Sequence, residues 1–266
     1  MELDLTLIII LLVTGFGAGM VDAIAGGGGL ITLPVLLSAG MSPVEALATN
    51  KLQGSFGTLA ASVYFVRKKL VDLSQMRLMI SCTFVGAVFG TLLVQQIDTS
   101  LLASVMPLLL VLIALYFMFS KRIGDEERDR KVSNAVFAFV FTFAIGFYDG
   151  FFGPGAGTFF AVAFVSLLGF SMAKATAHTK VLNFTSNIAS LIFFAIGGNI
   201  IWIAGFIMAA GQLVGGQLGA RMVVNKGVSL IRPLIVVVTL AMSAKLLVDQ
   251  YQQGGQLVGQ LLSWFS

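Results

Sequence analysis

The chain consists largely of apolar stretches, and their lengths limit what it can fold into. Most approach the roughly 20 residues that an α-helix needs to cross a bilayer. They lie approximately at residues 5–25, 28–39, 44–66, 77–95, 101–119, 133–152, 157–168, 173–197, 200–223 and 229–248. Only 11% of the residues are charged, whereas a soluble domain has about a quarter. The sequence therefore predicts an all-α integral membrane protein.

The second half of the chain repeats the pattern of the first. At an offset of 129 residues Lys51 matches Lys180, and upstream an offset of 127 pairs Asp22 with Asp149. In each half the second apolar stretch is short and follows a glycine-rich break, a pattern typical of a transporter site. We therefore divide the chain into a first transmembrane repeat (1–120), a cytoplasmic linker (121–132), a second transmembrane repeat (133–249) and an interfacial amphipathic tail (250–266).

The charges between the stretches predict how the halves lie in the membrane. Lysine and arginine gather near 67–77, 121–131 and 221–232, and are absent from the turns near 95–100 and 197–200. Such basic loops stay in the cytoplasm. If each short segment only dips into the membrane, one basic loop falls outside. If it completes a crossing, all three lie inside and the second half is inverted.

The positive-inside rule thus favours two inverted repeats, each of about four full spans plus a glycine-broken half-helix, with both termini outside. The net charge of +4 follows from the same loop bias. It gives no indication of nucleic-acid binding.

Lys51 and Lys180 lie inside predicted spans, at matching positions. A lysine at membrane depth costs roughly 2.5–3.5 kcal/mol, so two of them indicate a need for positive charge and an anion pathway between the halves. In the alternative interpretation each lysine lies near a helix end and extends to water. However, Lys51 follows Pro43 by about 12 Å of helix, which places it well inside a hydrocarbon core about 30 Å thick.

Polar residues beside these lysines extend the predicted substrate site. Amides, hydroxyls and a cation suit a partly dehydrated oxyanion. On a helix, Lys180, Asn183 and Asn187 share one face. His178 titrates near neutral pH and could take part in coupling, although a structural role is the stronger interpretation for it. The candidate ligands besides the lysines are Asn50, Gln53, His178, Thr179, Asn183 and Asn187.

The glycine breaks predict a second element of the same site. A helix is expected to begin after each break, at Leu30 and at Thr158. Free N–H groups and the dipole at a helix N-terminus bind anionic oxygens, so two facing ends would form one anion site near the midplane. The alternative is close helix packing. The candidate ligands here are Gly27, Gly28, Gly29, Gly155 and Gly157.

Asp22 and Asp149 precede the two breaks and are the predicted charge partners or proton-coupling groups. Each could neutralise a lysine when no substrate is bound, or take up a proton. Capping of the helix break is an alternative of nearly equal weight.

Catalytic motifs are not visible in the chain. It has one histidine, no His-Glu-x-x-His, no Gly-x-Ser-x-Gly and no Gly-Lys-Ser/Thr after a glycine break. We therefore expect no enzyme, metal site or cofactor, and a gradient of protons, of sodium or of the substrate as the driving force. A passive anion channel is the main alternative to a secondary transporter. The pairs Gly86-xxx-Gly90 and Gly215-xxx-Gly219 predict helix contacts, within one subunit or across a homodimer.

These features resemble the sulfite exporter (TauE/SafE) family, also called the TSUP family of anion transporters, and most closely its YfcA-like branch. The matching segments are 22–29, 48–54, 146–155 and 177–183, in the family's order. The resemblance implies a multi-pass protein of the bacterial inner membrane that moves sulfite, thiosulfate, a sulfonate or another organic anion across the lipid bilayer. We expect transport by alternating access.

Overall fold

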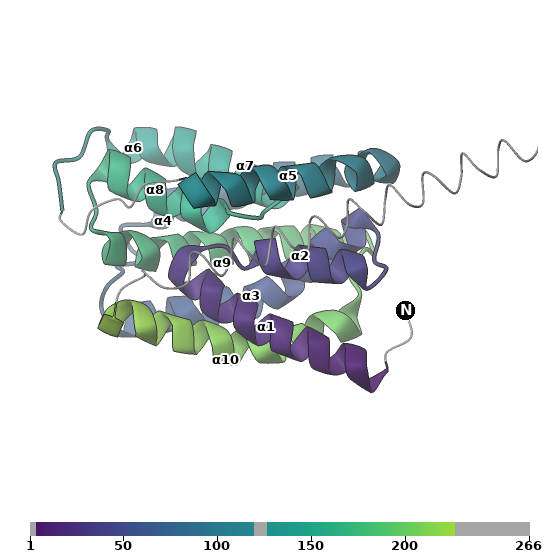
Figure 1. Cartoon of the computed structure of the whole chain (residues 1–266). Helices are drawn as coiled ribbons and strands as arrows, with labels where there is room; N and C mark the ends of the chain where they lie inside the picture. The colour runs from purple at the N-terminus through teal and green to yellow at the C-terminus, as the bar shows by residue number, and fades with distance from the viewer. Residues whose placement is uncertain (1–3, 120–126, 227–266) are drawn as a thin grey trace, which may run out of the picture.

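A computed structural model describes residues 4–119 and 127–226 of the chain, and every regular element in that part is helical (Figure 1). The last predicted span, 229–248, and the tail, 250–266, lie outside the described residues. The elements are α1 (Leu5–Ala25), α2 (Gly29–Ser38), α3 (Pro43–Arg67), α4 (Arg77–Val94), α5 (Thr99–Phe119), α6 (Asn134–Val136), the π-helical η1 (Phe137–Thr142), α7 (Phe143–Phe151), α8 (Ala156–Leu168), α9 (Met172–Ile196) and α10 (Trp202–Lys226).

Five helices of the described part are long and apolar enough to cross a membrane. They are α1, α4, the continuous helix Asn134–Phe151, α9 and α10. Helix α3 has the length, 25 residues, but its polar middle, with Asn50, Lys51 and Gln53, lowers its hydropathy. The helices α2 and α8 are shorter and apolar, as the sequence predicted. The chain is therefore an all-helical, multi-pass membrane protein.

Capping residues and glycines set the helix ends. Ser42 and Glu45 form a capping box before α3, with Pro43 in the first turn. Gly26 ends α1 with a φ of 75°, a left-handed conformation that glycine adopts without a Cβ clash. The bounds of α3 and α9 differ by 129 residues at both ends, so the repeat extends to the limits of these helices.

Helix packing follows the repeat as well. Helix α1 packs along α10, and α7 packs along α4. These contacts correspond to each other, because α7 is the counterpart of α1 and α10 is the counterpart of α4. Helix α3 packs against its own counterpart, α9. Each half therefore contributes one member to every one of these pairs, and the halves are interlocked.

Glycines allow the close approach in the two corresponding pairs. In the pairs Gly86-xxx-Gly90 and Gly215-xxx-Gly219, a side chain at any of the four glycines would overlap the backbone of the facing helix. This confirms that both pairs are helix contacts within the subunit. The facing residues are Phe143 for Gly86, Phe147 for Gly90, Phe16 for Gly215 and Met20 for Gly219.

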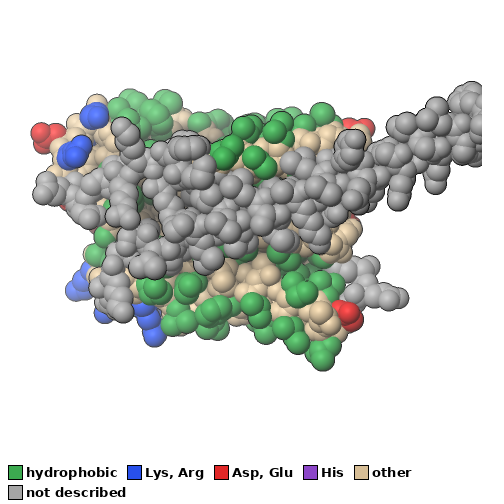
Figure 2. All heavy atoms as spheres, in the orientation of Figure 1, with side chains coloured by type: hydrophobic (Ala, Val, Ile, Leu, Met, Phe, Trp, Pro, Cys, Tyr) green, Lys and Arg blue, Asp and Glu red, His purple; other side chains and the backbone are tan. Residues whose placement is uncertain are grey.

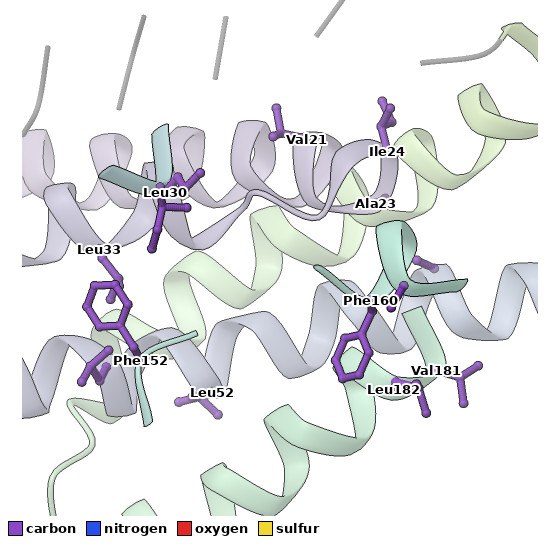
Figure 3. Packing of buried hydrophobic residues seen from close by; sticks show 14 of the residues in the cluster. Val21, Ala23, Ile24, Leu30, Leu33, Leu52, Phe152, Phe160, Val181 and Leu182 are labelled. Carbon is purple, nitrogen blue, oxygen red and sulfur yellow. The ribbon is translucent and has the colours of Figure 1, made fainter. Parts of the chain in front are cut away.

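Apolar side chains from both halves form one buried core. Figure 3 shows part of it, where Leu33 of α2 lies beside the ring of Phe152, which follows α7. Exposed apolar side chains cover the flanks of the molecule, whereas lysine and arginine gather at the end on the left of Figure 2. This distribution is expected for a bundle surrounded by lipid.

Candidate functional site

Lys51 and Asp149 form a buried ion pair between α3 and α7. The Nζ of Lys51 donates to Oδ1 of Asp149 at 2.6 Å, and the two side chains are 1% and 7% exposed. The other carboxylate oxygen accepts a hydrogen bond from the Ser186 hydroxyl of α9. Two charges so deep in a protein are tolerated when they pair and their remaining hydrogen bonds are satisfied.

Lys180 and Asp22 form a second, looser pair between α9 and α1. The Nζ of Lys180 donates to Oδ2 of Asp22 at 3.1 Å and also to the Asp22 backbone carbonyl. The side chains are 1% and 16% exposed. Oδ1 of Asp22 accepts only a long hydrogen bond, 3.4 Å, from the N–H of Gly28. The lysine is thus as buried as Lys51, but its aspartate is more accessible and less firmly held.

The two pairs are exchanged between the halves. Lys51 of the first half meets Asp149 of the second, and Lys180 of the second meets Asp22 of the first. Both lysines therefore lie in the protein interior and do not extend to water. The third ion pair in the described part of the chain, Lys174–Glu127, has exposed side chains, so these two are the buried ones.

A small polar cavity lies between the exchanged pairs. It has about 390 Å³ of empty space, part of it open to solvent. Both aspartates reach its wall, and five carboxamide side chains line it. Its residues are Asp22, Gly26, Gly28, Gly29, Asn50, Gln53, Gly54, Asp149, Gly153, Ala156, Gly157, Asn183, Asn187 and Gln212.

The glycine breaks of the two halves meet at this cavity. A Cβ at Gly26 would lie only 2.5 Å from the carbonyl carbon of Gly157, so the two breaks touch backbone to backbone. Helices α2 and α8 begin here, with Gly28 and Gly155 at their N-caps and no side-chain cap on either. The N–H groups of Leu30, Ala156 and Thr158 bond to backbone carbonyls of the breaks, and the positive dipole ends of both helices lie at the cavity, where they favour an anion.

The carboxamides offer hydrogen bonds that the protein does not fully use. Oδ1 of Asn50 accepts from Thr32 and from Gln53, both at 2.6 Å. The carbonyl oxygens of Gln53 and Asn183 are buried and have no hydrogen-bond partner in the described part of the chain. A buried polar group without a partner costs roughly 1–3 kcal/mol, and these two acceptors would be satisfied only by a ligand or water that donates a hydrogen bond.

Most residues proposed from the sequence lie at or beside the cavity. Asn50, Gln53, Asn183 and Asn187 line it, as do Gly28, Gly29 and Gly157 and both aspartates. Lys51 and Lys180 do not line the cavity themselves, but each is paired with an aspartate that does. Thr179, Gly27 and Gly155 do not appear in its wall, although Thr179 is buried with an unpaired hydroxyl.

His178 lies away from the cavity. Its ring packs against the stacked rings of Phe164 and Phe170, with ring centroids 5.6 and 4.9 Å away, and its Nδ1 lies 2.8 Å from the Lys174 carbonyl oxygen. The structure thus gives this histidine packing contacts and no contact with the polar site.

Gln212 of α10 was not singled out from the sequence. It stands in an apolar helix beside Gly211, and at the repeat offset its counterpart is Thr83, which is not a matching residue. A glutamine within a predicted span was the available signal, because polar side chains are costly at membrane depth, although Gln217 of the same span carries this signal as well. The described residues contain no cluster of three or more metal-ligating His, Cys, Asp or Glu side chains.

The chain is similar over most of its length to a known family and to several bacterial membrane proteins. The family described as sulfite exporter TauE/SafE matches residues 11–246. The probable membrane transporter protein YfcA of Escherichia coli (strain K12) is 51% identical over 247 residues, which cover 93% of this chain and 90% of that protein. A probable membrane transporter protein of Haemophilus influenzae is 48% identical over 250 residues, 94% and 98% of the two chains. A third, ORF9 of a Sinorhizobium species, is 43% identical over 248 residues, 93% and 95% of the two chains.

Proposed function

Since this chain belongs to the sulfite exporter TauE/SafE family of membrane transporters and is not an enzyme, we propose that it is a secondary transporter of a small sulfur-containing or organic anion. Sulfite, thiosulfate and sulfonates are the proposed class. The relatives are bacterial, and we place the protein in the inner membrane. Transport proceeds by alternating access to the cavity between the two halves.

The observation that carries this proposal is the pair of exchanged ion pairs around the cavity. Without substrate, each lysine is neutralised by an aspartate of the other half. An anion that enters the cavity can replace a carboxylate at a lysine, so the positive charge stays compensated with and without substrate. The positive dipole ends of α2 and α8 and the carboxamide N–H groups of the cavity wall stabilise the bound anion further.

The difference between the two pairs favours Lys180 as the lysine that meets the anion. Its partner Asp22 is more exposed than Asp149, and its ion-pair distance is longer. Asp149 is held in addition by Ser186. The Lys180–Asp22 pair therefore opens for substrate, while the Lys51–Asp149 pair holds the halves together.

The displaced carboxylate links transport to a second ion. When the anion occupies Lys180, Asp22 is left as an unpaired negative charge at the cavity. An unpaired charge in a low-dielectric interior is unfavourable. Asp22 then takes up a proton or a sodium ion, which moves with the anion.

The proposed inversion of the halves is the basis for alternating access. In Figure 1, α1 runs from right to left and the helix from α6 to α7 runs from left to right, although they are counterparts. The lysines and arginines visible in Figure 2 gather at one end of the bundle. We therefore propose that the two halves have opposite orientations, with that end in the cytoplasm, and that rocking one against the other opens the cavity to each side in turn.

Uptake into proteoliposomes tests the proposal. The full chain is reconstituted, and entry of sulfur-35 sulfite, thiosulfate and taurine is followed with and without a pH gradient. We expect saturable uptake of at least one anion, its loss in Lys180→Met, and normal uptake in Lys174→Met. Lys174 is a matched control because its ion pair with Glu127 is on the surface, with side chains 39% and 59% exposed.

Two results would contradict the proposal. Uptake by Lys180→Met equal to that of the wild type would show that the anion does not bind at Lys180. A flux that does not saturate, and that exceeds carrier rates, would identify a passive channel.

A further inference from the structure

Gln212 is a buried polar side chain whose hydrogen bonds are unused. It lies in α10, is 2% exposed and lines the cavity. Its carboxamide makes no hydrogen bond to any residue of the described ranges, while neither of its polar atoms is sealed off from the cavity space. Both the donor and the acceptor of this group are therefore available to a ligand.

The position of Gln212 is fixed by shape. Its side chain lies where α10 meets α1 and α3, opposite two glycines. A Cβ at Gly19 would lie 2.8 Å from Oε1 of Gln212, and a Cβ at Gly57 would overlap the same oxygen. The absence of side chains at Gly19 and Gly57 thus creates the slot that holds the carboxamide at the cavity wall.

The corresponding position in the other half has a different role. Thr83, the counterpart of Gln212, donates its hydroxyl to the Thr142 carbonyl oxygen at 3.4 Å and does not line the cavity. Ser186, the counterpart of Gly57, donates to Asp149. At the site formed by α4 and α9, then, both polar groups serve the protein itself, whereas at the equivalent site formed by α10 and α3 a single long carboxamide remains free.

The free carboxamide lies on the side of the Lys180–Asp22 pair. Gly19, which faces Gln212, and Asp22 are three residues apart on α1 and therefore lie on the same face of that helix. The side of the cavity with the looser ion pair is thus also the side with the unused donor.

We propose that Gln212 donates a hydrogen bond from its carboxamide N–H to the transported anion next to Lys180, and so helps to determine which oxyanion is accepted. This inference rests on the proposed function of the same cavity. A neutral donor beside a cation adds direction to the site, because a hydrogen bond requires the anion oxygen at a defined place, whereas charge attraction alone does not.

Two variants test this role in the full-length protein in proteoliposomes, with sulfur-35 sulfite, thiosulfate and taurine as the probes. Gln212→Met keeps the length of the side chain and removes the donor. We expect its KM for the best wild-type anion to rise about tenfold or more, as for the loss of a hydrogen bond to a charged group, with a changed order of preference among the probes. Gln212→Glu places a negative charge beside the anion and should abolish uptake.

Gln95→Leu is the matched control. Gln95 is a partly buried glutamine whose amide is bound to Thr91 and Asn199 away from the cavity, so KM should stay at the wild-type value. Elution as a single species and the melting temperature show whether each variant is folded. If Gln212→Met does not fold, Gln212→Asn replaces it, because this variant keeps the donor but withdraws it from the ligand by one methylene.

The outcomes separate this inference from the proposed function. Wild-type KM and wild-type preference in folded Gln212→Met, or in Gln212→Asn where it replaces that variant, overturn the role of Gln212 while leaving Lys180 in place. Uptake that is unchanged in Lys180→Met overturns the site, and this inference with it.

Discussion

Removal of Lys51 should destabilise the protein through its stranded partner. In Lys51→Met the carboxylate of Asp149, only 7% exposed, loses its cation and keeps only the hydroxyl of Ser186. Breaking a buried ion pair on one side costs about 3–5 kcal/mol of unfolding free energy. The control Lys174→Met breaks a surface pair and should cost no more than about 1 kcal/mol.

A double variant separates stability from transport. In Lys51→Met with Asp149→Asn both charges are gone, and the amide oxygen can still accept from Ser186. Replacing a whole buried pair by neutral groups is often close to neutral in free energy, so the double variant should regain most of the lost stability. Transport should remain impaired, because the exchanged charge pair that holds the halves together is absent.

The measurement is a titration with a denaturing detergent, followed by circular dichroism, on protein in mild detergent micelles, together with anion uptake in proteoliposomes. A loss of less than about 1 kcal/mol in Lys51→Met would refute the energetic argument. Wild-type transport by the double variant would show that the pair is dispensable for function.

Two further predictions concern packing and orientation. Gly90→Ala should lose about 1–3 kcal/mol or more because its methyl group would overlap the facing helix. Gly17→Ala, with nothing within 4 Å of the new methyl group, should gain about 0.5–1 kcal/mol; equal stabilities in the same titration would refute the close helix contact. In a Cys82→Ala background, Ser74→Cys should react with a membrane-impermeant maleimide only from the cytoplasmic side and Gly198→Cys only from the outer side. Labelling of both from one side would contradict inversion, since the two loops are counterparts.

The helices were largely predictable because they depend on local signals. The predicted spans 44–66 and 173–197 agree with Pro43–Arg67 and Met172–Ile196 to within one residue. A serine at the N-cap position precedes each, and each apolar pattern stops at a polar or glycine residue. The π-helical turn Phe137–Thr142 could not be predicted, because an apolar pattern does not distinguish neighbouring hydrogen-bond registers.

The charged centre was predictable in its members and not in its pairing. Lysine and aspartate inside apolar segments are costly, and this singles out Lys51, Asp149, Lys180 and Asp22 from the sequence. Which lysine meets which aspartate depends on the packing of α3, α7, α9 and α1. That packing is a tertiary property, and local sequence signals do not contain it.

His178 and Gln212 show where spacing along the chain misleads. His178 precedes Lys180 by two residues, which is about 200° around a helix, so it faces the aromatic residues and not the cavity. Gln212 reaches the cavity because two glycines on other helices make room for it. Proximity to Lys180 in the sequence therefore suggested His178, which lies away from the cavity, and the repeat gave no indication of Gln212, which lines it.

A structure of the protein with selenite, an analogue of sulfite that scatters anomalously, tests the central claim most directly. We predict an anomalous peak in the cavity within hydrogen-bond distance of Lys180 Nζ, with Asp22 displaced from the lysine and the Lys51–Asp149 pair retained. A peak elsewhere, with the Lys180–Asp22 pair intact at saturating selenite, would contradict the proposed site.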